Sequence, residues 1–171
     1  MLTDFTLQEA VRLGIRVTAR ISLILFSIAF ITSSLRFTLK NKFSFWMKNR
    51  RTVGLSFAFS HLIHGILFAT LYTVDPELFY QVAKPTTIIF GGLGYVFILA
   101  MAMTSNNFSI QKLGIKRWRT LHTIGMYYLW FIFFASYAPR VAGNLYFLFL
   151  VVPMLAILVL KILVKTKRLA L

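Results

Sequence analysis

The sequence predicts an all-α protein, a polytopic bundle of about five transmembrane helices with an N-terminal amphipathic helix. Hydrophobic residues make up 58% of the 171 residues and charged residues 13%, with a mean hydropathy of +0.77. Soluble proteins are nearer about 50% apolar and about 25% charged. The apolar residues form runs of about 20 residues, long enough to cross a bilayer, between short polar loops. Residues 1–171 are therefore expected to form a single domain.

The predicted spans are bounded by basic residues, prolines and polar turns. Asp75-Pro76 ends one span, because the residue before proline disfavours a helix, and Pro139-Arg140 turns the chain again. The predicted spans are 21–39, 53–74, 86–104, 120–138 and 145–163.

Residues 1–17 alternate apolar side chains with basic ones, and Arg12, Arg16 and Arg20 recur on a helical spacing. This pattern is typical of an amphipathic helix lying in the membrane interface. The same pattern also fits the beginning of the first span. Both interpretations stay open at the level of sequence.

The charge balance is strongly basic, with 19 Lys and Arg against 4 Asp and Glu. In a membrane protein such an excess marks cytoplasmic loops and binds anionic lipid, so nucleic acid is not an expected partner. The basic segments 40–51, 105–119 and 165–168 fall on one side of a five-span bundle. The C-terminus is therefore predicted to be cytoplasmic. Cysteine is absent from the chain, which excludes disulfides, iron–sulfur clusters and thiolate metal sites.

The chain has three histidines, His61, His64 and His122, and all lie within predicted spans. His61 and His64 are three residues apart and share one helix face. Each histidine could be a structural residue bonded to a neighbouring helix, but three on two spans favour a ligand role. Imidazole is a common axial ligand of haem iron, whereas zinc or a proton relay would call for accompanying carboxylates. Ser60, one turn before His64, is the expected acceptor for its second ring nitrogen.

Two sequence elements resemble the ferric-reductase-like transmembrane family, and a weaker third precedes the first span at 14–19. One element is Arg50-Arg51-Thr-Val-Gly-Leu followed by His64. The other element runs from Ala102-Met103-Thr104-Ser105 through Leu113-Gly114 to Trp118-Arg119-Thr120-Leu121-His122. The similarity covers about 14–138 and is strongest to the branch of MsrQ-type haem-binding membrane subunits of bacterial methionine sulfoxide reductase systems.

The resemblance implies a multi-pass protein of the bacterial inner membrane that passes electrons across it through haem b, one or two groups in number. His64 and His122 would be iron ligands, with His61 as a ligand or a neighbour of one. Arg51 would contact a haem propionate or lipid headgroups, and Trp118 would lie at the interface or at the electron entry. The expected partners are membrane lipids, a flavin reductase or quinol as donor, and an external redox acceptor protein. A quinone or a partner's flavin is a further expected cofactor. The chain would be at most the electron-transfer subunit of an oxidoreductase.

The chain also departs from the family pattern. The family has a further N-terminal span, and it has a histidine thirteen residues beyond the position of His122, where this chain has Ala135. His64 and His122 are expected at different depths, so they should not share one iron. Met126, one turn beyond His122, is an alternative ligand. A haem-free structural or assembly subunit is therefore the competing prediction, whereas a transporter or channel lacks a charged pathway within the spans.

Overall fold

The computed structural model describes residues 6–38, 45 and 48–169, with only the backbone described for 33–38 and 167–169. The helices are α1 (Leu7–Thr38), α3 (Arg50–Val74), α4 (Pro76–Val82), α5 (Pro85–Met103), α6 (Asn107–Leu113), α7 (Ile115–Tyr137) and α8 (Leu148–Leu169), with the 3₁₀ turns η1 (Ala138–Ala142) and η2 (Leu145–Phe147). These ranges contain no strand, so the predicted all-α helical bundle is confirmed.

Four helical segments are long and apolar enough to cross a membrane: Leu7–Thr32, Arg50–Val74, Pro85–Met103 and Leu145–Thr166. They correspond to four of the five predicted spans. The fifth, predicted over 120–138, is present as the 23-residue helix α7, which has spanning length but contains several Tyr, Trp and His residues. These residues lower the mean hydropathy of α7, which is why α7 is not among the four apolar segments above.

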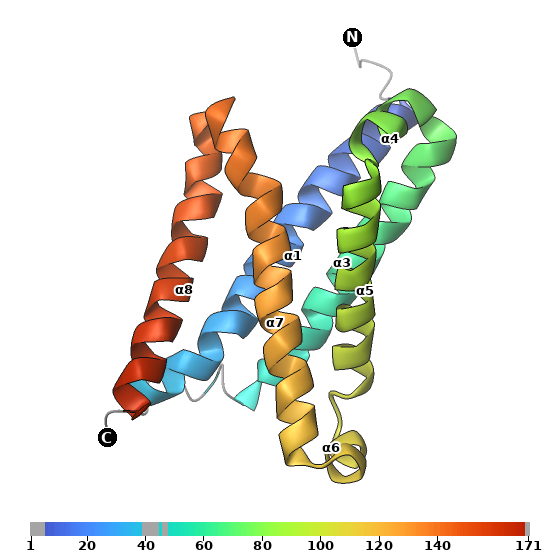
Figure 1. Ribbon diagram of the computed structural model, residues 1–171. Helices are drawn as coiled ribbons and strands as arrows, with labels where there is room; N and C mark the ends of the chain where they lie inside the picture. Colours follow the sequence, from blue (N-terminus) through green and yellow to red (C-terminus); the bar gives the residue numbers. More distant parts are fainter. Residues whose placement is uncertain (1–5, 39–44, 46–47, 170–171) are drawn as a thin grey trace.

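The N-terminal segment is continuous with the first span. Helix α1 runs unbroken for 32 residues from Leu7, so the described part of 1–17 is the beginning of the span and not a separate interfacial helix. At 1.5 Å per residue α1 is about 48 Å long, well above the roughly 30 Å of a hydrocarbon core. A helix of this length has to tilt, and α1 runs obliquely behind the other helices (Figure 1).

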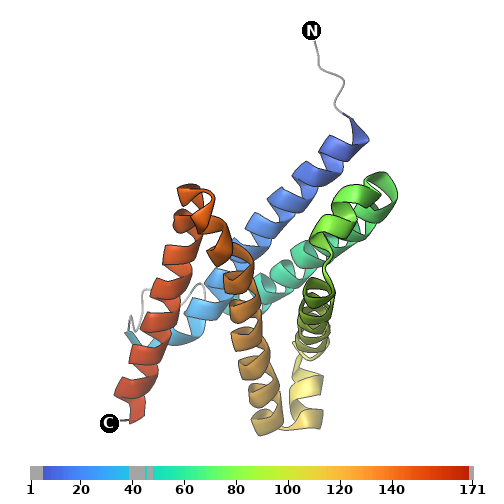
Figure 2. The same cartoon turned by 45° about the horizontal axis from the view of Figure 1, so that its top comes forward.

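Helices α1 and α3 form an antiparallel pair, and their register is marked by polar contacts. Thr18 meets His64, and one turn further along α1 the hydroxyl of Ser22 lies 3.0 Å from that of Ser60. Helices α5, α7 and α8 stand against this pair, as the two views of the chain show (Figures 1 and 2). The start of α3, α6 and the end of α8 lie together; we call this the basic end, and α4, η1 and η2 lie at the opposite end.

An aromatic cluster holds α1, α3 and α7 together. Phe26 and Phe30 of α1 are 1% and 0% exposed, and the Phe26 ring lies 5.5 Å from Phe57 of α3 and 5.2 Å from Phe133 of α7. Inside a membrane such packing replaces the hydrophobic effect as the force between helices, because lipid tails are as apolar as the side chains. The cluster therefore fixes the level at which the three helices meet.

The turns at the two ends are locally specified. At the basic end Gly114 adopts φ +76°, a conformation that favours glycine, and it joins α6 directly to α7. At the opposite end Asp75 caps α4 by accepting from the Leu78 amide and pairs with Arg12 of α1. The Arg12 guanidinium and the Leu78 amide lower the pKa of the Asp75 carboxyl. This pair fastens the start of α1 to the α3–α4 turn.

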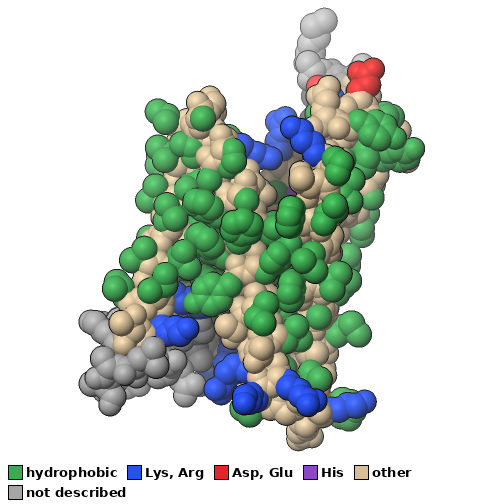
Figure 3. All heavy atoms as spheres, viewed as in Figure 1, with side chains coloured by type: hydrophobic (Ala, Val, Ile, Leu, Met, Phe, Trp, Pro, Cys, Tyr) green, Lys and Arg blue, Asp and Glu red, His purple; other side chains and the backbone are tan. Residues whose placement is uncertain are grey.

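Helices α5 and α7 touch near the basic end and diverge towards the opposite end. Gly94 of α5 packs against Leu129 of α7, and beyond that level the ribbons separate while α1 and α3 lie behind them (Figures 1 and 2). The space-filling view shows a recess there, with Lys or Arg side chains above and a histidine at depth (Figure 3).

Candidate functional site

His61 and His64 form a pair on α3, which we call the histidine pair. Their ring centroids are 5.2 Å apart and the planes are inclined by 25°. The two residues are three positions apart, and this spacing places them on one face of the helix. Because the rings stack side by side from one helix, they cannot stand on opposite sides of one metal ion in this arrangement.

His64 is oriented by α1. Its Nδ1 lies 3.2 Å from the Ile15 carbonyl oxygen and 3.3 Å from the Thr18 hydroxyl. A carbonyl oxygen only accepts, so Nδ1 carries the proton and Nε2 keeps a free lone pair. This is the arrangement in which protein histidines bind metals, with one nitrogen tied to a carbonyl and the other available.

The predicted partner of His64 was wrong. Ser60 bonds across to Ser22 of α1 and leaves His64 to Thr18 and Ile15. Ser60 was the expected acceptor because it lies one turn before His64 on the same helix. The Thr18 hydroxyl bends back on the α1 backbone, 2.7 Å from the Gly14 oxygen and 3.2 Å from the Ile15 oxygen, so the Ile15 carbonyl lies beside both Thr18 and His64.

His61 lies in a box of aromatic rings. Its centroid is 5.0 Å from Tyr95 of α5, 5.6 Å from Phe133 of α7 and 5.7 Å from Phe57. Its Nδ1 is buried and finds no hydrogen-bond partner among the residues that the structure describes. A buried polar atom without a partner costs free energy, which favours a functional reason for keeping it.

His122 has a different environment, near the basic end of α7. Its Nε2 lies 3.1 Å from the Thr104 hydroxyl, and that hydroxyl donates to the Ala100 carbonyl, so Nε2 is the donor to it. Trp118 covers the imidazole at a centroid distance of 4.4 Å and donates from Nε1 to the Thr104 carbonyl. Thr104, Trp118 and His122 are called the His122 site below.

The histidine pair and the His122 site lie at different levels of the bundle. Phe133, which touches His61, follows His122 by eleven residues on α7, about 16 Å along the helix. This separation agrees with the expected difference in depth between His64 and His122. The family position for a further histidine is Ala135, whose side chain is exposed on α7, and Met126 packs against the hydrophobic core.

Arg51 lies at the start of α3, far along that helix from the histidine pair. Its guanidinium donates to the Asn107 side-chain oxygen at 2.8 Å, which joins α3 to α6 at the basic end. Within the described residues no group of three or more His, Cys, Asp or Glu side chains comes together.

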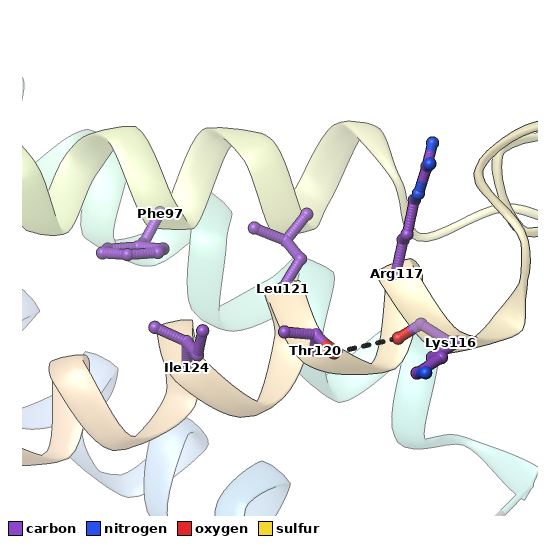
Figure 4. A pocket seen from close by; sticks show the side chains of 6 residues that line it. All are labelled: Phe97, Lys116, Arg117, Thr120, Leu121 and Ile124. Carbon is purple, nitrogen blue, oxygen red and sulfur yellow. Dashed lines mark hydrogen bonds between the residues drawn. The ribbon is translucent and has the colours of Figure 1, made fainter.

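A groove of about 600 Å³ lies between α5 and α7 near the basic end. Phe97, Leu121 and Ile124 line its apolar part, and Lys116 and Arg117 lie beside its mouth (Figure 4). Thr120 is tied back to the Lys116 carbonyl at 3.1 Å. A groove with an apolar floor and cationic rim suits an amphiphile with an acidic or polar head.

Sequence reasoning did not single out two arginines that lie over aromatic rings, Arg20 and Arg140. Arg20 lies 5.7 Å from the Tyr146 ring, and Arg140 lies 5.7 Å from the Tyr137 ring. The sequence around Arg20 fits either an interfacial helix or the beginning of the first span, and Pro139-Arg140 predicts a turn. A signal was present, since Arg20 falls near the middle of the apolar segment Leu7–Thr32, where a charge is costly.

Comparison with known proteins gives a family match and partial matches to curated relatives, among them the two described here. The family described as ferric reductase like transmembrane component matches residues 18–135. The haem-binding subunit MsrQ of the protein-methionine-sulfoxide reductase of Brucella anthropi is 33% identical over 84 residues, which cover 46% of this chain and 36% of that protein. Magnetosome protein MamZ of Magnetospirillum gryphiswaldense is 31% identical over 77 residues, covering 44% and 12%. The matches thus cover only a minor part of either relative. No solved structure matches.

Proposed function

Because the chain belongs to the family of ferric reductase-like transmembrane components, we propose that it binds haem b and passes electrons across a bacterial inner membrane. The whole chain, 1–171, would act as one domain and as the electron-transfer subunit of an oxidoreductase. MsrQ, which is similar over less than half of this chain, is a haem-binding subunit. That likeness supports haem as the cofactor. The sides on which the electron donor and the electron acceptor bind are inferred from the two ends of the bundle.

One observation carries the proposal: His64 presents a free Nε2 within the membrane. Its other nitrogen is held by Ile15 and Thr18 of α1, and the neighbouring His61 has a buried Nδ1 without a described partner. Imidazole held in this way is a standard haem ligand, so the residues fit the cofactor. His64 would be an axial ligand, and His61 would border the same site.

Haem supplies reversible one-electron chemistry, and the protein supplies position and insulation. Phe57, Tyr95 and Phe133 pack around the ring of His61, which stacks on His64. Ile15 fixes the His64 ring and keeps the proton on Nδ1. The His122 site would hold a second haem only if His122 gave up the hydrogen bond from its Nε2 to Thr104, so that this nitrogen could bind iron.

The basic end is proposed to face the cytoplasm. Lys116 and Arg117 beside the groove and Lys165 in α8 lie at this end, in line with the positive-inside rule. The groove with Phe97 and Leu121 would take an anionic lipid or a quinol, and a cytoplasmic flavin reductase would be the other donor. The recess at the opposite end would face the external acceptor.

A visible spectrum of the purified protein tests the cofactor. We expect a Soret band and a sharp reduced α-band, with about one haem per chain for a site at His64 alone. A featureless spectrum from protein expressed with haem supplied would sink the proposal. It would favour the second candidate, a haem-free assembly subunit, which the satisfied Nε2 of His122 and the alanine at position 135 support.

Reporter fusions test the orientation. A fusion after Leu171 is expected to report the cytoplasm, and an insertion within 76–84, beside α4, is expected to report the external side. Fusions that report the same side at both places would contradict the proposed orientation, whatever the spectrum shows.

A further inference from the structure

Arg20 and Arg140 come from distant parts of the chain and meet beside one aromatic group. Tyr137, Tyr146 and Phe147 form this group, in which the Tyr137 and Phe147 rings lie 6.1 Å apart and the Tyr146 and Phe147 rings 6.2 Å apart. Arg20 lies over Tyr146, and Arg140 lies 5.7 Å from Tyr137 and 5.8 Å from Phe147. We call Arg20 and Arg140 the arginine pair.

The arginine pair lies about one helical turn from the histidine pair. Tyr137 follows Phe133 by four residues on α7, about 6 Å, and Phe133 packs against His61. On α1, Arg20 follows Thr18, the residue that contacts His64, by two positions. Measured along the helix axes, Arg20 and the Tyr137 ring that Arg140 contacts thus lie within about one helical turn of the contacts that α1 and α7 make with the histidine pair.

The arginine pair has no acidic partner in the described structure. The ion pair found there joins Arg12 to Asp75, and Glu9 is bonded to Thr6. Arg20 and Arg140 are both exposed, yet Arg20 belongs to a membrane-spanning segment. Arginine in such a segment is costly unless an anion accompanies it, and the aromatic contacts hold the guanidinium groups without neutralising them.

We infer that Arg20 and Arg140 bind the carboxylate groups of the haem whose iron ligand is His64. The inference rests on the proposed haem function and adds the residues that recognise the edge of the cofactor. Guanidinium groups bind carboxylates through paired, charge-assisted hydrogen bonds. The two arginines are positioning residues for the haem and take no part in electron transfer themselves.

The test compares haem with haem dimethyl ester, in which both carboxylates are blocked. Apoprotein in detergent is titrated with each compound, using wild type, Arg20→Gln, Arg140→Gln and the double variant. We expect wild type to bind haem at least about tenfold more tightly than the ester, since hydrogen bonds to charged groups are of this strength. The double variant is expected to bind the two compounds alike.

Several results would overturn the inference. Wild type that does not distinguish haem from its ester would show that no group of the protein binds the carboxylates. A double variant that keeps the wild-type preference would place the carboxylates elsewhere. Loss of a bound anionic lipid from the double variant, seen by native mass spectrometry with the haem preference unchanged, would assign the arginine pair to lipid.

Controls separate this inference from the proposed function and from misfolding. Arg117→Gln makes the same substitution at the basic end and is expected to keep the full preference for haem. Arg20→Lys keeps the charge and should retain part of the preference, which a folding defect would not do. Wild type that binds neither compound would refute haem binding itself and the arginine pair's role with it.

Discussion

The histidine pair and the His122 site place the same side chain in opposite hydrogen-bonding states. His64 donates from Nδ1 to a backbone carbonyl of α1 and keeps Nε2 free. His122 donates from Nε2 to Thr104, so its remaining lone pair is on Nδ1, next to its own backbone. The free nitrogen at His64 points away from the helix, and that is the nitrogen on which a large planar cofactor fits most easily.

The two regions also differ in what surrounds the imidazoles. His61 packs against aromatic rings of α3, α5 and α7 and stacks on His64, whereas His122 lies between one tryptophan and one threonine close to the basic end. The comparison teaches that a histidine's presence in a span is not enough to make it a ligand. The partner of the other nitrogen and the space around the ring decide the role.

The largest expected effect separates His64 from His122. His64→Ala should reduce haem affinity by at least about 100-fold, since losing a ligand should exceed the 10–100-fold typical of losing a ligand's hydrogen-bond partner. His122→Ala should reduce it by about tenfold or less. Haem per protein and the reduced α-band measure both variants. Equal losses would contradict the comparison, and full haem in His64→Ala would remove His64 as a ligand.

A medium effect is expected at His61, on the stability of the protein. His61→Phe removes the buried Nδ1 that lacks a described partner and fits the aromatic box, so the free energy of unfolding should rise by about 1 kcal/mol. Haem content should remain near that of wild type, whereas His64→Phe should lose it. Loss of haem in His61→Phe would show that His61 is itself an iron ligand.

The smallest effect is expected far from both imidazole sites, at Asp75. Its folded pKa lies below the unfolded value of about 4, so the stabilisation is present above that pH and is lost as pH falls through the folded pKa. As the pH falls below about 4, wild type should lose thermal stability more steeply than Asp75→Asn does. Glu77→Gln, an exposed residue in the same turn of α4, serves as the control and should titrate as wild type does.

The sequence by itself determined the fold class, the positions of the spans and the family. Each of these depends on local composition, because the difference between lipid and water acts on each segment separately. The elements around His64 and His122 also carried the resemblance without any knowledge of contacts. The early beginning of the first span was one of two alternatives, and only the continuous helix α1 from Leu7 decided it.

The tertiary structure decided which groups meet inside the bundle. Sequence pointed to Ser60 for His64, but the structure supplied Ile15 and Thr18, 49 and 46 residues away along the chain. It also brought Arg20 and Arg140 to one aromatic group, although nothing in their local sequence relates them. Hydropathy tells which segments enter the membrane. Within it all helices are apolar, so the contacts between them depend on side-chain shape and on polar groups that find partners on other helices.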